Sequence, residues 1–211
     1  VIKKEEIAIG SAFLVGGQII QAVVGFGVNL VLVRYLAPEE FGRFAIILAG
    51  AALVYSILSL RTETMVIRVS VDQLTDGAKD RYFGAALIET VLATSVICIW
   101  MMVTSSSGNW EIGLVLAIGL RHWMFQNKAF FERTMPYRKL ALIETLVATA
   151  SHFVALGLVL CGVGWSVLFI REIFLSIAGL LGIWAIGGLS LRKFKFPSLA
   201  DWQLLFNEAR G

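Results

Sequence analysis

Charged residues, prolines and cysteines are all scarce in this chain of 211 residues. Only 16% of the residues are charged, whereas 58% are hydrophobic and the mean hydropathy is +0.81. Soluble domains carry about 25% charged residues, so this composition argues against a water-soluble globular fold. Three prolines in so apolar a chain also argue against disorder. The two cysteines, Cys98 and Cys161, are too few for a disulfide framework and form no metal site.

Six long apolar runs contain most of the hydrophobic residues. They cover residues 7–33, 44–63, 82–103, 112–131, 140–163 and 165–189, and the second is predicted to continue as a helix to residue 71. Each run is long enough to cross a bilayer as a helix, which takes about 20 residues. The runs are continuous and do not alternate in polarity, which argues against a large porin-type barrel.

The connections between these runs are short, so neighbouring helices must lie antiparallel. The sequence therefore predicts an all-α, polytopic membrane protein, a bundle of six transmembrane helices in residues 1–190. Residues 191–211 are predicted to form a basic linker and the start of a further helix, with an amphipathic stretch at 199–206. The chain starts at Val1 and stops abruptly at Gly211, so we expect a fragment of a longer protein.

Six spans leave no room for a soluble catalytic domain. His122 and His152 have no metal-ligand partners at useful spacing, and no Ser-His-Asp arrangement has supporting context. We therefore expect a protein that is not an enzyme and that needs no metal or cofactor. The net charge of +3 has to be read loop by loop in a membrane protein, so nucleic acid is not an expected partner.

Lysine and arginine are distributed unequally between the two sides of the predicted bundle. One side carries Lys3, Lys4, Lys79, Arg81, Arg133, Arg138, Lys139, Arg192, Lys193 and Lys195. The other side carries only Arg34 and Arg43. Since cytoplasmic loops are enriched in these residues, we expect the first side, and with it both termini, in the cytoplasm.

The third and fifth runs open with nearly the same sequence. Residues 86–95 and 141–150 both begin Ala-Leu-Ile-Glu-Thr, and the preceding runs also resemble each other. Arg61, Arg68 and Asp72 are spaced i, i+7, i+11, and so are Arg121, Lys128 and Glu132, which places each set on one helix face. A duplicated helical hairpin is the simple interpretation, because transporters are commonly built from repeats. Chance in an apolar sequence is the alternative.

Three arginines inside the predicted spans are the candidate substrate-binding residues. A charge at the bilayer centre costs about 2.5–3.5 kcal/mol on insertion scales, so such residues normally face the bundle interior. Arg121 lies near the middle of its span, Arg61 in the cytoplasmic third of the second, and Arg171 near the opposite end of the sixth. Arginine suits phosphate oxygens, because its charge is permanent and its donors form a fork. Snorkelling to the headgroups is the alternative for Arg61, and pairing with a neighbouring helix is the alternative for Arg171.

Acidic residues and one histidine in the spans are candidates for charge balance or proton relay. They are Glu89, Glu144, His152 and Glu172. Glu89 and Glu144 lie near the cytoplasmic ends of their spans, where capping of a helix N-terminus is the alternative role. His152 is central in its span, and a hydrogen-bonded packing role is its alternative.

The first run carries a polar face of small residues. Gln18, Ala22, Gly25 and Asn29 recur at 4-3-4 spacing, with Gln21 beside them. Close helix packing is one interpretation. The other is that Gln18 and Asn29 line a path for a sugar-bearing substrate.

Residues 31–44 resemble the junction between the first two helices of polysaccharide flippases. The residues that carry the resemblance are Arg34, Leu36, Pro38, Glu40, Phe41 and Gly42. Residues 60–63 are similar to the family pattern near the end of helix two, and residues 202–206 after the basic tail resemble the approach to helix seven. The resemblance is to the Wzx-like branch of the multidrug/oligosaccharidyl-lipid/polysaccharide exporter superfamily.

This resemblance implies a transport function in two six-helix lobes, of which the chain supplies the N-terminal one. Such proteins pass undecaprenyl-diphosphate-linked oligosaccharides across the bacterial inner membrane by alternating access, for surface polysaccharides such as the O-antigen of lipopolysaccharide. The implied partners are the lipid-linked oligosaccharide, membrane lipids, the missing second lobe, and polysaccharide polymerase and chain-length proteins.

Other functions stay open at this point. One is a cation-coupled multidrug efflux transporter of the same superfamily, which would have an acidic cavity. Another is a membrane enzyme of cell-wall assembly, which would need a His/Asp or metal cluster at a membrane face. A scaffold lobe that does not itself transport is a further alternative.

Overall fold

The computed structural model describes residues 4–70, 73–104, 108–133, 137–187 and 196–210, and every regular element within them is an α-helix. The helices are α1 (Lys4–Tyr35), α2 (Pro38–Leu58), α3 (Thr62–Arg68), α4 (Asp76–Val103), α5 (Asn109–Glu132), α6 (Tyr137–Leu160), α7 (Ser166–Ala185) and α8 (Leu199–Arg210). Five of them, α1, α2, α4, α6 and α7, are long and apolar enough to cross a membrane. The prediction of an all-helical, polytopic membrane protein is confirmed.

Helix α5 is the predicted fourth span, and it is less apolar than the other five. It carries Arg121, His122, Gln126, Asn127 and Lys128 within two turns, which lowers its hydropathy below that of a spanning helix. Its polar residues are nevertheless largely covered, because α5 packs against α3, α4 and α7. A central helix of this kind can keep polar groups away from lipid by turning them toward its neighbours.

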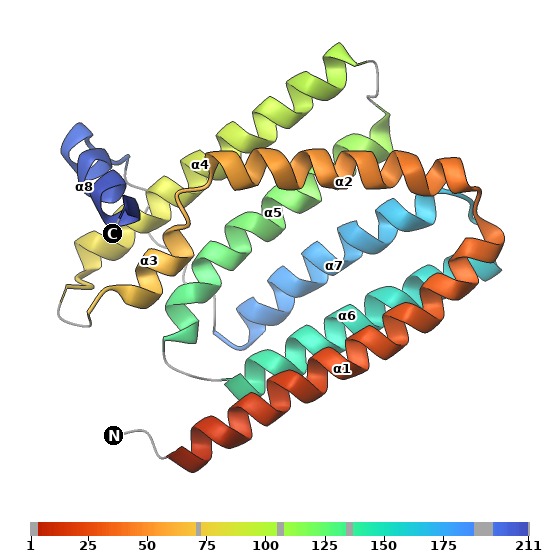
Figure 1. Cartoon of the computed structure of the whole chain (residues 1–211), viewed down its shortest axis with the longest axis horizontal. Coiled ribbons are helices and arrows are strands. Elements are labelled where there is room, and N and C mark those ends of the chain that lie inside the picture. Colours follow the sequence, from red (N-terminus) through yellow and green to blue (C-terminus); the bar gives the residue numbers. More distant parts are fainter. Residues whose placement is uncertain (1–3, 71–72, 105–107, 134–136, 188–195, 211) are drawn as a thin grey trace.

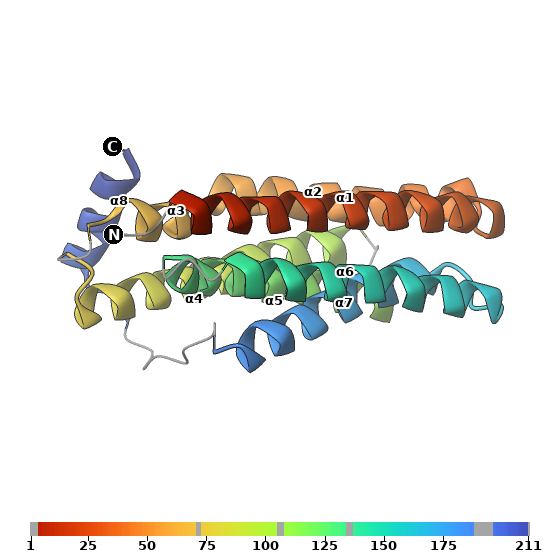
Figure 2. The ribbon, with the colours of Figure 1, turned by 90° about the horizontal axis from the view of Figure 1, so that it is seen from below.

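The helices form two layers. Figure 2 shows α1 and α2 in one layer and α4, α5, α6 and α7 in the other. The pairs of helices that pack against each other are α1 with α6, α6 with α7, α7 with α5, α5 with α4, and α4 with α2. Consecutive long helices run in opposite directions, so the start of α1 and helix α8 lie toward the same end of the bundle (Figure 1).

Residues around the junction of α1 and α2 explain why the chain turns there. Pro38 occupies the first turn of α2, where it fits a helix start, and the Glu40 carboxylate accepts a hydrogen bond from the Ala37 backbone N–H at 2.8 Å. One turn further on, Arg43 forms an ion pair with the fully buried Glu111 of α5 and lies over the Trp165 ring. These contacts join the α1–α2 and α4–α5 connections at one end of the bundle.

The predicted continuation of the second helix to residue 71 is wrong at residues 59–61. Helix α2 ends at Leu58, and α3 begins at Thr62 after Arg61 takes a left-handed backbone conformation with φ 53°. The Leu60 N–H donates to the Glu89 carboxylate of α4 at 3.1 Å, a contact that an unbroken helix would not make. Residues 71 and 72, and with them the predicted position of Asp72, lie outside the described part of the chain.

Helix α8 is amphipathic, as predicted, and it packs on α3. Leu205 is fully buried against the start of α4 and α3, and Arg81 donates to the Asp201 carboxylate at 3.2 Å. Hydrogen bonds from the Ser198 hydroxyl and backbone N–H, with help from Arg81, hold the pKa of Asp201 below its usual range. The helix start is therefore capped by a charged carboxylate. The predicted basic linker at 191–195 lies outside the described residues.

Candidate functional site

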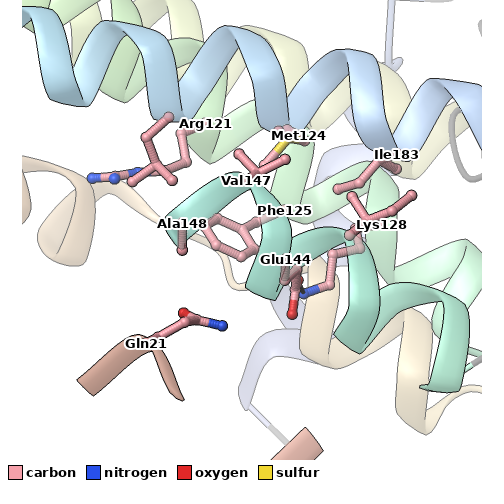
Figure 3. A pocket seen from close by; sticks show the side chains of 12 residues that line it. Gln21, Arg121, Met124, Phe125, Lys128, Glu144, Val147, Ala148 and Ile183 are labelled. Atoms are coloured by element: carbon pink, nitrogen blue, oxygen red, sulfur yellow. Dashed lines mark hydrogen bonds and ion pairs between the residues drawn. The ribbon is translucent and has the colours of Figure 1, made fainter. Parts of the chain in front are cut away.

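A pocket of about 450 Å³ opens between α5, α6 and α7, with one residue contributed by α1. Its lining consists of Gln21, Arg121, Met124, Phe125, Lys128, Ile143, Glu144, Val147, Ala148, Leu175, Gly179 and Ile183. Most of these are apolar; Lys128 points toward Glu144, whereas Arg121 and Gln21 lie apart from that pair (Figure 3). An apolar cavity with a few convergent polar groups is the usual form of a ligand site.

Arg121 and Lys128 both line the pocket, as their spacing of seven residues on one helix face predicts. Lys128 is buried and donates to Glu144 at 2.5 Å, and its Nζ lies 3.1 Å from the Glu132 carboxylate one turn along α5. The spacing predicts Lys128 on this face, but Lys128 is not among the predicted site residues. The structure therefore adds Lys128 to the candidate residues.

A chain of polar contacts extends from Arg121 across α7 to α1. Arg121 donates to the Glu172 carboxylate at 2.8 Å, and Arg171 donates to the same carboxylate at 3.1 Å. Arg171 also donates to the Asn29 side-chain oxygen at 3.2 Å. Four of the predicted site residues are thus brought together, and the two arginines share a single carboxylate.

The face of α1 that packs on α6 is rotated relative to the predicted polar face and shares Gly25 with it. Gly17 and Gly25 are buried and lie against Thr145 and His152 of α6, and Gln21 lines the pocket and donates to Thr145 at 3.4 Å. Gln18 is exposed and does not line the pocket. Since a helix turns 100° per residue, the stripe predicted from 18, 22, 25 and 29 lies partly beside the packing face. Gln21 therefore takes the place predicted for Gln18.

His152 lies at the contact between α6 and α1. A methyl group built on Gly25 would come within 2.9 Å of the imidazole Nε2, so the glycine makes room for this ring. The His152 Nδ1 is buried with no hydrogen-bond partner among the described residues. The ring is outside the lining of the pocket and lies against α1, without the Nδ1 hydrogen bond that a hydrogen-bonded packing role would include.

Arg61 and Glu89 are not part of this pocket. Arg61 is exposed at the break between α2 and α3. Glu89 is buried on the opposite side of α5, where its carboxylate lies 2.8 Å from His122 Nε2 and accepts from Gln126 at 3.3 Å. The two glutamates of the repeated sequence therefore approach α5 from different sides, Glu89 from α4 and Glu144 from α6.

The arrangement suits an anionic group at the end of an apolar chain. Two cations, Arg121 and Lys128, line the pocket; Arg121 is paired with Glu172, and Lys128 is paired with Glu144 and Glu132. Because Arg121 shares Glu172 with Arg171, the guanidinium donors of the two residues exceed the acceptors that Glu172 offers them. Phosphate oxygens can use such donors, and the Leu, Ile, Val and Phe side chains of the lining offer an apolar wall beside them.

Comparison with known proteins finds a matching family and similar translocation proteins. The family model of the polysaccharide biosynthesis proteins matches residues 31–200, beginning at the junction motif. The Man(5)GlcNAc(2)-PP-dolichol translocation protein RFT1 of Saccharomyces cerevisiae is 27% identical over 135 residues, which cover 61% of this chain and 22% of that protein. Its counterpart of the same name in Candida glabrata is 30% identical over 130 residues, covering 61% and 21%.

The chain thus spans about a fifth of the length of these two relatives, and no solved structure matches it. The resemblance to Wzx-like polysaccharide flippases is confirmed by the family match and by relatives named as translocation proteins. This chain belongs to the polysaccharide biosynthesis protein family.

Proposed function

We propose that the chain is the N-terminal lobe of a transporter that flips a polyprenyl-diphosphate-linked oligosaccharide across a membrane by alternating access. The observation that carries the proposal is the pocket between α5, α6 and α7, which places Arg121 and Lys128 in an otherwise largely apolar lining. The diphosphate would take the donors of Arg121 and Arg171, the polyprenyl chain the apolar wall, and Gln21 and Asn29 would contact the sugar. Glu144 and Glu172 would hold these cations when the pocket is empty.

The finer parts of the proposal come from the resemblance and the charge pattern. The carrier is undecaprenyl diphosphate, the membrane is the bacterial inner membrane, and both termini face the cytoplasm. Residues 1–190 form a six-helix lobe that pairs with a second lobe, and residues 191–211 lead toward it. The lobe carries no catalytic role. A cation-coupled drug pump is less well supported, because Glu144 and Glu172 are each already paired with basic side chains.

The test is translocation by the purified intact protein in lipid vesicles. A short fluorescent oligosaccharide would be attached through a diphosphate to either undecaprenol or dolichol, and its exposure to a membrane-impermeant glycosidase would be followed. We expect both lipids to move faster than in protein-free vesicles, and the undecaprenyl lipid to move faster than the dolichyl lipid. A faster dolichyl lipid would contradict the bacterial carrier, and no acceleration of either would contradict the function.

A further inference from the structure

The break between α2 and α3 interrupts a helix that the sequence alone predicts to be continuous. Helix α2 ends at Leu58 and α3 begins at Thr62, and both have helix-forming sequences. Between them, Arg61 adopts the left-handed conformation with φ 53°, which is unfavourable for a residue with a side chain of this kind. Contacts from elsewhere in the molecule must therefore hold the bend.

One such contact is made by a buried carboxylate on α4. Glu89 is 4% exposed, and its Oε2 accepts a hydrogen bond from the Leu60 N–H at 3.1 Å. In an unbroken helix the Leu60 N–H would donate instead to the Ser56 carbonyl, four residues earlier. The Glu89 carboxylate therefore replaces the helical hydrogen bond that the bend removes.

The same carboxylate has two further polar partners on α5. Glu89 Oε1 lies 2.8 Å from His122 Nε2 and 3.3 Å from Gln126 Nε2. The His122 ring packs on the Tyr55 ring of α2 with centroids 4.5 Å apart, and the Tyr55 hydroxyl bonds Thr94 of α4 at 2.7 Å. One buried carboxylate thus connects α2, α4 and α5 at the point where α2 stops.

Few titratable groups surround Glu89. His122 faces it from α5, and Tyr55 faces it from α2. Arg61 and Glu63 belong to the break and the first turn of α3, and Cys98 lies two turns along α4 near Tyr55.

We propose that Glu89 is a proton-binding site whose charged form stabilises the break between α2 and α3. The charged carboxylate holds the Leu60 N–H and the bent chain, because a hydrogen bond to an ionised acceptor is roughly twice as strong as one to a neutral group. A proton added to the carboxylate weakens that bond, and the Leu60 N–H then returns to the Ser56 carbonyl. Helices α2 and α3 join into one helix, and Arg61 leaves its strained conformation.

This change would move α3 away from α5. In the bent state Arg133, just after α5, donates to the Val66 carbonyl of α3 and to the Val69 carbonyl just after α3, at 2.5 and 2.6 Å. Straightening breaks these contacts and swings α3 outward at the end of the bundle where α8 also lies (Figure 1). Neither the proton nor the movement of α3 depends on the transport of a lipid-linked sugar.

The repeated sequence provides a matched control. Glu144 occupies the same place in Ala-Leu-Ile-Glu-Thr on α6 as Glu89 does on α4, but its carboxylate accepts from Lys128 and touches no helix break. Neutralising Glu144 removes the same charge from the same sequence context. It should leave α3 where it is.

The experiment is a distance measurement between spin labels in the intact protein in lipid nanodiscs. Labels would replace Ile67 on α3 and Val91 on α4, which are both about half exposed, after Cys98 and Cys161 have been changed to alanine. We expect one distance for wild type at alkaline pH and a second, longer distance on acidification. Glu89→Gln, a permanently neutral side chain, should show the longer distance at every pH.

Glu144→Gln should behave as wild type in the same measurement. The proposal is overturned if Glu89→Gln shows only the wild-type distance, if wild type does not respond to acid, or if Glu144→Gln also shows the longer distance. Each of these outcomes is independent of whether the protein transports a lipid-linked sugar.

A second variant keeps the test decisive if Glu89→Gln does not fold. Leu60→Pro removes the N–H that Glu89 accepts and cannot enter a helix interior, so it fixes the break. Ser59 has φ −73° and ψ 124°, an extended conformation that suits the residue before a proline. This variant should keep the single shorter distance at every pH. A longer distance on acidification of Leu60→Pro would overturn the proposal for Glu89.

Discussion

Replacing Arg121 with alanine in the intact protein is expected to lower translocation of the lipid-linked oligosaccharide about 10- to 100-fold. This range corresponds to the loss of a hydrogen bond to a charged group, which is worth about 1.5–3 kcal/mol. The protein should still fold, because Glu172 keeps its second partner, Arg171, at 3.1 Å. The measurement is the amount of surface polysaccharide made by cells that depend on the variant.

Two further variants test whether the loss of translocation arises from the pocket. Arg121→Lys retains the charge but loses the fork of donors, so it should recover only part of the activity. Arg34→Ala removes an exposed arginine at the far end of α1 and should leave the activity unchanged. Full activity of Arg121→Ala, or an equal loss from Arg34→Ala, would refute a role for Arg121 in holding the substrate.

Replacing Lys128 with methionine is expected to destabilise the protein by about 2–3 kcal/mol. Breaking a buried ion pair costs about 3–5 kcal/mol, because it leaves an uncompensated charge. The expected loss is smaller here, since the side chains left behind, Glu144 and Glu132, are 34% and 27% exposed. Methionine keeps the volume of the lysine stem, so the loss reports charge and not a cavity. Unfolding in detergent micelles measures it.

The double variant with Glu144→Gln isolates the pair. Removing both partners avoids the unpaired carboxylate, so the second substitution should restore at least half of the stability lost by the first. Additive losses would mean that Lys128 and Glu144 do not depend on each other. That result would contradict the ion pair as the element that holds the pocket in its empty form.

Local patterns predicted much of this fold and part of its pocket. The length and polarity of the runs were enough to predict the long helices, because a segment that crosses a bilayer must be apolar and must satisfy its own backbone hydrogen bonds. The seven-residue spacing of Arg121 and Lys128 was enough to place both on the face that lines the pocket. The partnership of Arg121 with Glu172, 51 residues away, needed the packing of α5 on α7.

The misplaced features all depend on contacts between distant segments. The break at residues 59–61 is held by Glu89, 29 residues away, and nothing in the local sequence interrupts the helix. Whether Gln18 or Gln21 lines the pocket depends on which face of α1 contacts α6. Gly17 and Gly25 determine that face, because they leave room for Thr145 and His152. Spacing alone defines a helix face only to within about one residue, or 100°.

The central claim is that the diphosphate-linked lipid binds in the pocket between α5, α6 and α7. A photoreactive residue at Val147, which lines the pocket, tests it directly against the same residue at Leu146, which is 60% exposed on the outside of α6. With a radiolabelled undecaprenyl-diphosphate oligosaccharide, we predict strong crosslinking at Val147 that Arg121→Ala weakens, and little crosslinking at Leu146. Equal crosslinking at the two positions, unaffected by Arg121→Ala, would contradict the claim.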